Sequence, residues 1–280
     1  MKVPGVKITT LVDDCCFTGG LLGEHGLSIL VENKYGAVLF DTGQGMALEH
    51  NIKAMGLDLS DLDAAAVSHG HNDHTGGLMK VLKMRGKDGM TIYAHRGIFN
   101  PRQKLGKDGR PADTGIPFTQ AELEKEGAVF KFNNGPTEII TGIMLTGPIE
   151  RLFKETSTKS HFIVKNGELV EDPFEDDQAL VVETSQGIVI IFGCAHAGVI
   201  NTMNHVEKIT GEKRFYALLG GTHLLEADRN QLENTLKEIE KRDVSIIAFS
   251  HCTGFHSCAF FAEYFRGKYY QSDVGFSIEF

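Results

Sequence analysis

Short apolar segments separated by turn residues recur along the chain, and they predict strands. From Val6 to Val12, β-branched residues occupy every second position, which is typical of a strand with one buried face. Similar segments recur at 27–32, 37–40, 64–67, 90–94, 179–183, 188–192, 216–219 and 245–249. Apolar residues at helical spacing predict helices over 46–56, 78–84, 199–209 and 230–241. This order of strands and helices predicts an α/β fold.

Several of these strands stop at a loop that carries histidine or aspartate. The residues concerned are Asp41, His69, His196, His223 and His251. Active sites commonly collect at strand ends, because a rigid sheet holds the loops there in place. The pattern therefore makes these side chains the first candidates for a functional site.

A dense group of possible metal ligands follows the segment 64–67. His69 and His71 are two residues apart, so in an extended chain they can aim two imidazoles at one point. Asp73 and His74 come where the chain turns into the next helix, and they can face the same pocket from another side. Imidazole and carboxylate suit zinc, manganese or iron. These donors exceed what one ion needs from one loop, which indicates one or two divalent metal ions, zinc being favoured.

Further donors must come from elsewhere in the chain. His196 and His251 each follow an apolar strand directly, and we interpret both as metal ligands. His223 has the same placement, and a contact with substrate or support of a ligand fits it equally well. His25 precedes a strand and either reaches the pocket or caps a loop. We assign catalytic roles to His223, His25 and Asp73, the last as a group that also orients water.

Three more residues are weaker candidates around the metal. Asp41 could orient a ligand imidazole through its other ring nitrogen, or it could simply form the Asp-Thr-Gly turn. Cys194 and Cys252 each lie within two residues of a candidate histidine. They could be soft ligands, although buried thiols are more often packing residues. The other histidines, His161 included, are expected to be structural or on the surface.

The segment 96–136 is more polar and contains several prolines. We interpret it as a lid or insertion beside the site, within a single domain that spans 1–280. A surface excursion without a role fits the same composition.

Charge narrows the range of partners. The chain carries 37 acidic and 28 basic residues, for a net charge of −9. Nucleic acid is an unlikely partner, because affinity for a phosphate backbone needs clustered lysine and arginine. A small anionic or phosphate-bearing substrate remains compatible with a few local cations. Lys159, Arg151 and Arg96 are candidates for that role, although solvated surface positions suit them better.

No apolar run is long enough to span a membrane, and the first residues do not resemble a signal peptide. We therefore expect a cytoplasmic protein. Its five cysteines are odd in number and lack zinc-finger spacing, so they are interpreted as thiols. The oligomeric state cannot be inferred from these patterns.

Residues 68–77, Ser-His-Gly-His-Asn-Asp-His-Thr-Gly-Gly, resemble the HxHxDH signature of the metallo-β-lactamase superfamily. Asp41-Thr42-Gly43 resembles that family's motif after an early strand. The resemblance implies a four-layer αββα sandwich of two mixed sheets flanked by helices, with metals held at one edge. It also implies a set of metal ligands, which comprises His69, His71, Asp73, His74 and His251.

A finer resemblance concerns one branch of that superfamily. The segments 24–28, 193–198, 220–224 and 251–254 look like those of proteins similar to 7,8-dihydropterin-6-yl-methyl-4-(β-D-ribofuranosyl)aminobenzene 5'-phosphate synthase. Where many superfamily members carry a bridging aspartate, this chain has Gly193-Cys194, with His196 two residues later. His196 could be the middle ligand of the family, or that position could be vacant near Asp177. His71 is intact, unlike the oxygen-reducing diiron members, which have glutamate there.

These observations predict a metal-dependent hydrolase that uses metal-activated water. A divalent metal lowers the pKa of water enough to supply a nucleophile near neutral pH. A transferase acting on a pterin- or phosphate-containing substrate is the related prediction. The alternatives are a lactone or phosphodiester hydrolase and, from another class, a non-catalytic metal-binding or sensory module.

Overall fold

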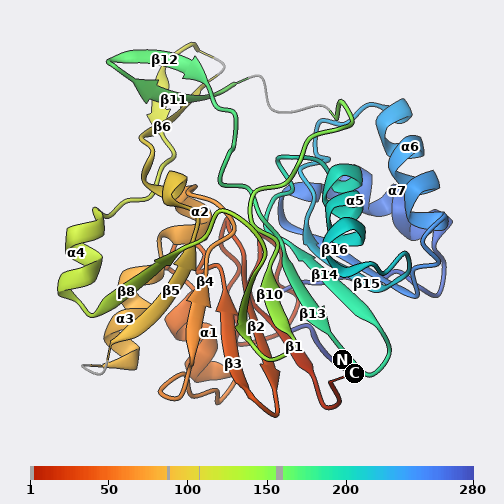
Figure 1. Ribbon diagram of the computed structural model, residues 1–280, viewed down its shortest axis with the longest axis horizontal. Coiled ribbons are helices and arrows are strands. Elements are labelled where there is room, and N and C mark those ends of the chain that lie inside the picture. Colours follow the sequence, from red (N-terminus) through yellow and green to blue (C-terminus); the bar gives the residue numbers. More distant parts are fainter. Residues whose placement is uncertain (1–2, 87–88, 107, 156–159) are drawn as a thin grey trace.

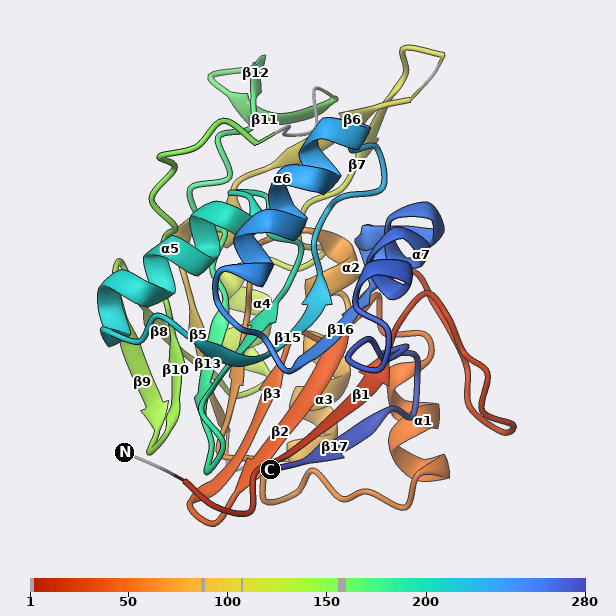
Figure 2. The ribbon, with the colours of Figure 1, turned by 90° about the vertical axis from the view of Figure 1, so that its right-hand side faces the viewer.

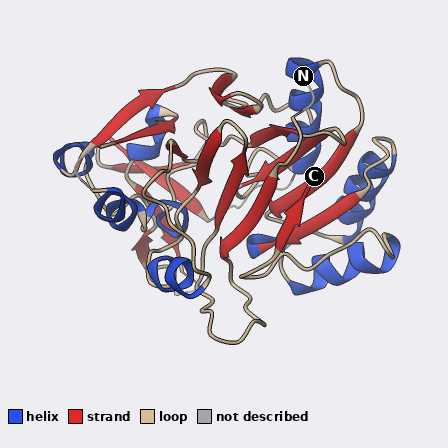
Figure 3. Cartoon of the chain, turned by 90° about the horizontal axis from the view of Figure 1, so that it is seen from below, coloured by secondary structure: helices blue, strands red, loops and turns tan. Residues whose placement is uncertain are grey.

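The computed structural model describes residues 3–86, 89–106, 108–155 and 160–280 (Figure 1). Over this part of the chain, the strands form three sheets, of seven, six and four strands. The two larger sheets lie face to face, and helices cover their outer sides (Figures 1 and 3). The predicted α/β sandwich of the αββα type is confirmed.

The first sheet has the strand order β17-β1-β2-β3-β4-β5-β8. Strands β3, β4, β5 and β8 run parallel, whereas β17, β1, β2 and β3 pair antiparallel. Its members are β1 (Lys7–Val12), β2 (Ser28–Asn33), β3 (Gly36–Phe40), β4 (Ala64–Ala66), β5 (Met90–Ala94), β8 (Ala128–Phe132) and β17 (Ser277–Glu279).

The second sheet has the order β16-β15-β14-β13-β10-β9, and its strands β14, β15 and β16 run parallel. Its members are β9 (Thr137–Ile140), β10 (Ile143–Leu145), β13 (Leu180–Glu183), β14 (Ile188–Phe192), β15 (Phe215–Gly221) and β16 (Ile246–Ser250).

Alternation along the strands builds the layers. In β14, Val189 and Ile191 point into the core between the sheets, while Ile190 and Phe192 point toward the helices. In β2, Ile29 and Val31 face the inner core in the same way. Because successive strand residues face opposite sides, strands buried on both faces become almost continuously apolar.

Helices cover the outer faces. The first sheet packs against α1 (Leu48–Ala54), α3 (Leu78–Arg85) and α4 (Gln120–Lys125). The second packs against α5 (Val199–Thr210), α6 (Arg229–Glu240) and α7 (Phe255–Tyr264). Figure 2 shows α5, α6 and α7 together on one side of the molecule. No helix within the described residues is both long and apolar enough to cross a membrane.

The segment 96–136, which the sequence analysis interprets as a lid or insertion, contributes strands to two different sheets. Its first part contributes a short 3-10 helix (Arg96–Phe99), β6 (Arg102–Leu105) and β7 (Pro111–Asp113). Strands β6 and β7 join β11 (His161–Lys165) and β12 (Glu168–Glu171) in the four-stranded sheet, called the small sheet below. Its last part, α4 and β8, instead extends the first large sheet. Because β6 and β11 are far apart in the sequence, their pairing could not be predicted from the composition of the segment.

Candidate metal centre

The candidate residues meet at one edge of the two sheets, where strands end. Asp41 follows β3, Cys194 follows β14 and His251 follows β16. His69 lies in the loop between β4 and the short helix α2 (Asn72–Thr75). Parallel strands bring their carboxyl ends to the same edge, and this explains why segments far apart in sequence converge.

The backbone is strained at this edge. Asp41, Ala195, His223 and His251 are non-glycine residues with positive φ, at 59°, 51°, 51° and 49°. Such conformations carry an energetic cost and cluster at functional sites, because the surrounding structure must hold them in place. The sheet ends thus hold the four loops in conformations that isolated chains rarely adopt.

Three imidazoles form what we call the imidazole cluster: His69, His71 and His196. His69 Nε2 lies 2.9 Å from His71 Nδ1 and 3.2 Å from His196 Nε2. Burial lowers the pKa of all three well below the usual histidine value. The rings are therefore neutral, and neutral imidazole is the form that binds a metal.

A hydrogen-bond relay fixes which ring nitrogens are unprotonated. Asp41 Oδ2 accepts from Ser68 Oγ at 2.6 Å and faces His74 Nδ1 at 2.7 Å. Since the Ser68 hydroxyl gives its proton to Asp41, its oxygen accepts from His69 Nδ1, 2.9 Å away. Both imidazoles then carry a lone pair on Nε2, which faces the site. In this position Asp41 can orient the His74 imidazole through its Nδ1 atom.

A second group, which we call the carboxylate cluster, comprises Asp14, His25, Asp73, His74 and His251. Asp73 Oδ2 lies 3.3 Å from His25 Nε2, 3.5 Å from His251 Nε2 and 3.8 Å from His74 Nε2. Asp14 faces His25 Nδ1 at 2.9 Å and His251 Nδ1 at 2.6 Å. Because Asp14 accepts from Nδ1 of both rings, the Nε2 atoms of His25 and His251 face Asp73.

The charges of the carboxylate cluster differ from those of the imidazole cluster. Burial alone would raise the pKa of Asp73, but His74 and His251 outweigh it and hold that pKa well below its usual range. Burial alone would lower the pKa of His251, but Cys252, Asp14 and Asp73 reverse the shift. His251 Nε2 is buried and has no hydrogen-bond partner among the described residues. Such a negative, donor-rich pocket is suited to a bound cation.

Cys194 lies between the two clusters. Its sulfur is 3.1 Å from His74 Nε2. It also falls within 4.8 Å of the ligand atoms of His69 and His196, and of those of His74 and His251. The thiol therefore occupies the place where one ligand could reach two ions. Cys252 lies beside it and accepts a hydrogen bond from the His223 N–H at 3.2 Å.

Close packing explains the glycine before Cys194. A Cβ added to Gly193 would lie 2.2 Å from Ser68 Oγ and 3.2 Å from Asp41 Oδ2. Any side chain at this position would displace the relay that sets the two imidazoles.

A cavity of about 480 Å³ opens over both clusters. His25, His223 and Asp73, to which the sequence analysis assigned catalytic roles, all line it. It is also lined by Lys104 and His161, neither of which had been assigned to the site. Asp14 was missed as well, although it follows β1 almost directly and the strand-end rule could have found it.

The cations suggested by the sequence do not contribute to this cavity. Arg96 stacks on the Phe132 ring, 4.2 Å from its centre, and Arg151 is an exposed residue outside the lining. Lys159 lies outside the described residues.

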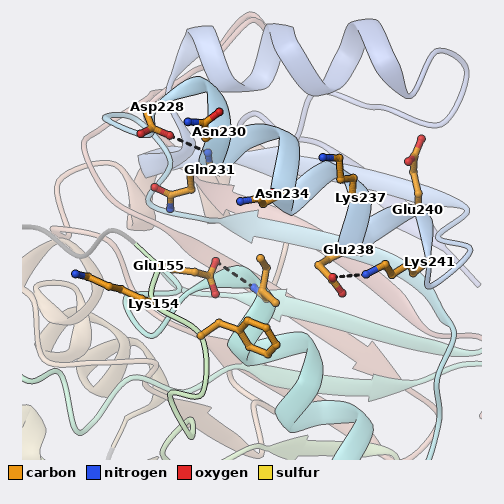
Figure 4. Close-up of a pocket in the computed structure, with 12 residues that line it drawn as sticks. Lys154, Glu155, Asp228, Asn230, Gln231, Asn234, Lys237, Glu238, Glu240 and Lys241 are labelled. Carbon is orange, nitrogen blue, oxygen red and sulfur yellow. Dashed lines mark hydrogen bonds and ion pairs between the residues drawn. The ribbon is translucent and has the colours of Figure 1, made fainter.

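A larger cavity of about 910 Å³ lies elsewhere, between α6 and the segment 153–155 (Figure 4). Its charged groups already have partners. Glu155 accepts from the Ile200 and Asn201 N–H groups, and Lys241 pairs with Glu238 at 2.6 Å. Among the described residues, the groups that could hold a metal lie at the other site. The chemistry is therefore expected around the two clusters.

The chain is similar to known proteins over most of its length. The chain is 31% identical over its whole length, and over 98% of the other chain, to 7,8-dihydropterin-6-methyl-4-(beta-D-ribofuranosyl)-aminobenzene-5'-phosphate synthase of Methanocaldococcus jannaschii. An uncharacterized protein of that organism, MJ0448, is 29% identical over 89% of this chain and 91% of its own length.

A solved structure gives a similar result. The crystal structure of Tm1679, described as a metal-dependent hydrolase of the beta-lactamase superfamily, matches 98% of this chain and 99% of its own with a TM-score of 0.85 and 31% identity. Zn(2+)-bound PqqB from Methylobacterium extorquens shares the fold, with a TM-score of 0.58 at 13% identity over 98% of this chain and all of its own. The sequence profile of the metallo-beta-lactamase superfamily matches residues 21–251. The chain belongs to the metallo-β-lactamase superfamily.

Proposed function

We propose that this protein is a metal-dependent hydrolase that uses activated water on a small substrate bound in the 480 Å³ cavity. One observation carries the proposal. Ring nitrogens of several buried imidazoles, one carboxylate and one thiol face a common centre from separate strand ends. So many lone pairs at such short range repel one another unless a cation lies between them.

The donors divide between two metal ions. His69, His71 and His196 would hold one, and Asp73, His74 and His251 the other. Cys194 takes the position between them. The unpartnered Nε2 of His251 and the relay through Asp41 both fit this assignment. Imidazole and thiolate together favour zinc over the harder manganese ion.

Bound metal would supply Lewis acidity, which acidifies water and polarises the substrate. The protein's own groups then manage protons. His25 lines the cavity, and its side chain is 60% exposed. Asp14 fixes its Nδ1, so Nε2 faces Asp73 and the cavity. We assign His25 the proton that goes to the leaving group, and Asp73 the orientation of the attacking water.

His223 would act on the substrate rather than on a metal. It lies in a strained turn after β15, which its N–H bond to Cys252 Sγ helps to fix. The ring lines the cavity 4.5 Å from the His196 ring, and its Nδ1 has no partner among the described residues. A donor in this place can hold a polar group of the substrate beside the metals.

A second candidate function is group transfer on a pterin- or phosphate-containing substrate. The synthase of M. jannaschii, 31% identical over the full chain, favours it. The same donors would serve both reactions, since only the attacking group differs. Transfer would be favoured if an aminobenzene ribofuranoside phosphate joined the methyl carbon of a dihydropterin that carries a diphosphate leaving group. Diphosphate would be released and the proton of the attacking group lost to solvent as the new bond forms.

The experiment begins with metal analysis of protein purified without added ions. We expect about two ions per chain and turnover of esters, lactones or phosphodiesters with zinc present. The double variant His71→Ala/His74→Ala should lose most of the metal and the turnover. His50→Ala, an exposed histidine on α1, is the matched control and should lose neither.

Two results would overturn the proposal. Full metal content in the double variant would refute the ligand assignment. Stoichiometric metal without turnover across the panel and the transfer assay would instead indicate a binding or sensory module.

A further inference from the structure

The small sheet is fixed to the loop that carries the histidines. Arg102 of β6 is buried and pairs with Asp172 and Asp176, at 2.6 Å in both cases. Asp176 also accepts the N–H of Gly70 at 2.8 Å, from the middle of the histidine motif. The Asn72 N–H donates to Thr114 O at 2.8 Å. Side chains of the small sheet therefore have a defined position over the cavity, and the Arg102 charge is already neutralised.

Two side chains of the small sheet enter the cavity together. Lys104 of β6 and His161 of β11 are direct partners in the antiparallel pair, so they project from the same face. Both line the cavity above the clusters. Figures 1 and 2 show β6 and β11 at one end of the molecule, away from the two large sheets.

Neither side chain has a protein partner for the polar atom in question among the described residues: Lys104 is exposed, and His161 is buried. Among the described residues, no carboxylate lies within 4.0 Å of the Lys104 ammonium group. His161 is only 5% exposed, yet its Nδ1 has no hydrogen-bond partner in the described structure. A buried polar atom left without a partner costs free energy, so its retention points to a ligand. Lys104 is also the one lysine or arginine among the described residues of the lining.

The other half of the molecule contributes an apolar surface to the same cavity. Leu225, after β15, is 62% exposed, and Phe255, the first residue of α7, is 80% exposed. Both line the cavity, and Leu225 packs on Gly254, where an added Cβ would lie 2.3 Å from Leu225 Cδ1. Ligand pockets combine such apolar surfaces with a few polar groups that fix orientation.

We infer that Lys104 and His161 bind the phosphate group of the substrate, while Leu225 and Phe255 cover a flat apolar part of the same molecule. The inference rests on the proposed function, because it concerns the substrate of that site. Phosphate oxygens accept hydrogen bonds from an ammonium group and from an imidazole N–H, and the charge makes these bonds strong. The substrate class is an aromatic or heteroaromatic phosphate ester.

Calorimetric titration with two probes tests this assignment. Phenyl phosphate carries both features, and inorganic phosphate carries only the charge. Each probe is titrated into the protein as purified and after removal of metal by a chelator. We expect Lys104→Met to weaken binding of both probes by roughly tenfold or more. Lys104→Arg should restore part of the affinity, because it keeps the charge.

Two further variants separate the contributions. Phe255→Ala should weaken the binding of phenyl phosphate by roughly tenfold and leave the binding of inorganic phosphate unchanged. Only phenyl phosphate has a ring that is buried against Phe255. Lys165→Met removes the same charge from β11 outside the cavity lining and should leave both affinities at the wild-type level.

Metal analysis of every variant distinguishes this inference from the proposed function. Wild-type affinity of Lys104→Met for both probes, with its metal intact, would overturn the phosphate site alone. Loss of metal from Lys104→Met would overturn it too, because the lysine would then act on the centre and not on the ligand. If the wild-type protein bound no metal, the proposed function would be refuted, whatever its affinity for the two probes.

Discussion

The imidazole cluster and the carboxylate cluster lie side by side but differ in charge and in access to solvent. The first consists of three buried neutral rings, with no carboxylate among its members. The second contains two aspartates and borders the cavity through the exposed His25. A dication held by the first would be neutralised only through Cys194, which lies between the clusters, whereas the aspartates of the second would neutralise much of the charge of its ion. An ion in the imidazole cluster would therefore be the stronger Lewis acid. The carboxylate cluster would attract a cation more strongly, because of its negative charge.

Removal of one donor from each cluster gives the largest expected effect and tests whether the two clusters differ. His196→Ala leaves only two imidazoles in the imidazole cluster, and no other histidine of that cluster can replace the lost ligand. We expect its ion to be lost and activity to fall by about 10³-fold, the size typical of a lost electrostatic element. His251→Ala should cost less, because His25 and Asp14 remain beside Asp73. Elemental analysis and initial rates measure both, and equal losses would contradict the difference.

A change of Asp41 should weaken metal binding at both clusters, because Asp41 contacts His74 directly and His69 through Ser68. The amide group of Asp41→Asn can donate a hydrogen bond to His74 Nδ1 or to Ser68 Oγ. The protons of His74 and His69 would then move from Nδ1 to Nε2, where a metal ligand needs a lone pair. We expect metal affinity to fall by about 10–100-fold at both positions. Competition with a chelating dye measures it, with the exposed Asp61→Asn as control. An effect confined to one ion would show that Ser68 does not connect Asp41 to His69.

Asp14 should act on the carboxylate cluster alone. It contacts His25 and His251 but no member of the imidazole cluster in the described structure. We expect Asp14→Asn to weaken one ion by roughly tenfold, the lower end of the range for residues that orient ligands. The second ion should keep its wild-type affinity in the same titration. A matched loss of both ions would mean that the clusters are not independent.

The smallest effect concerns the helix that follows the His196 loop. Burial raises the pKa of Glu155 above its usual 4.5, even though backbone N–H groups of α5 oppose the shift. The folded protein therefore holds this proton more tightly than the unfolded chain. Its contribution to the free energy of unfolding is present below pH 4.5 and lost as the pH rises through the raised pKa. Chemical denaturation across that range should show a flatter profile for Glu155→Gln.

Much of the fold and part of the candidate site could be predicted from local sequence. Strands such as 90–94 and 188–192 are periodic and buried, and the structure places them as expected. The clustered histidines and Asp41 stand next to predicted strand ends, so neighbouring residues were sufficient to find them.

The remaining features depend on pairings that sequence does not display. Lys104 and His161 meet only because β6 and β11 pair in one register. Helix α7 was missed because apolar residues occur around most of its surface, Phe255 and Phe260 included, so helical periodicity is weak. The place of Cys194 between the clusters required the β14 loop to be set against the histidine motif.

The attachment of the small sheet limits how a substrate can enter. Its backbone pairs with the histidine motif at His71 and Gly115, and Arg102 ties it to the loop around Gly70. A swing of this sheet wide enough to admit a molecule would pull His71 out of line with its neighbours. Entry of a molecule past Phe255, which lines the same cavity from the other half of the protein, would leave this attachment intact.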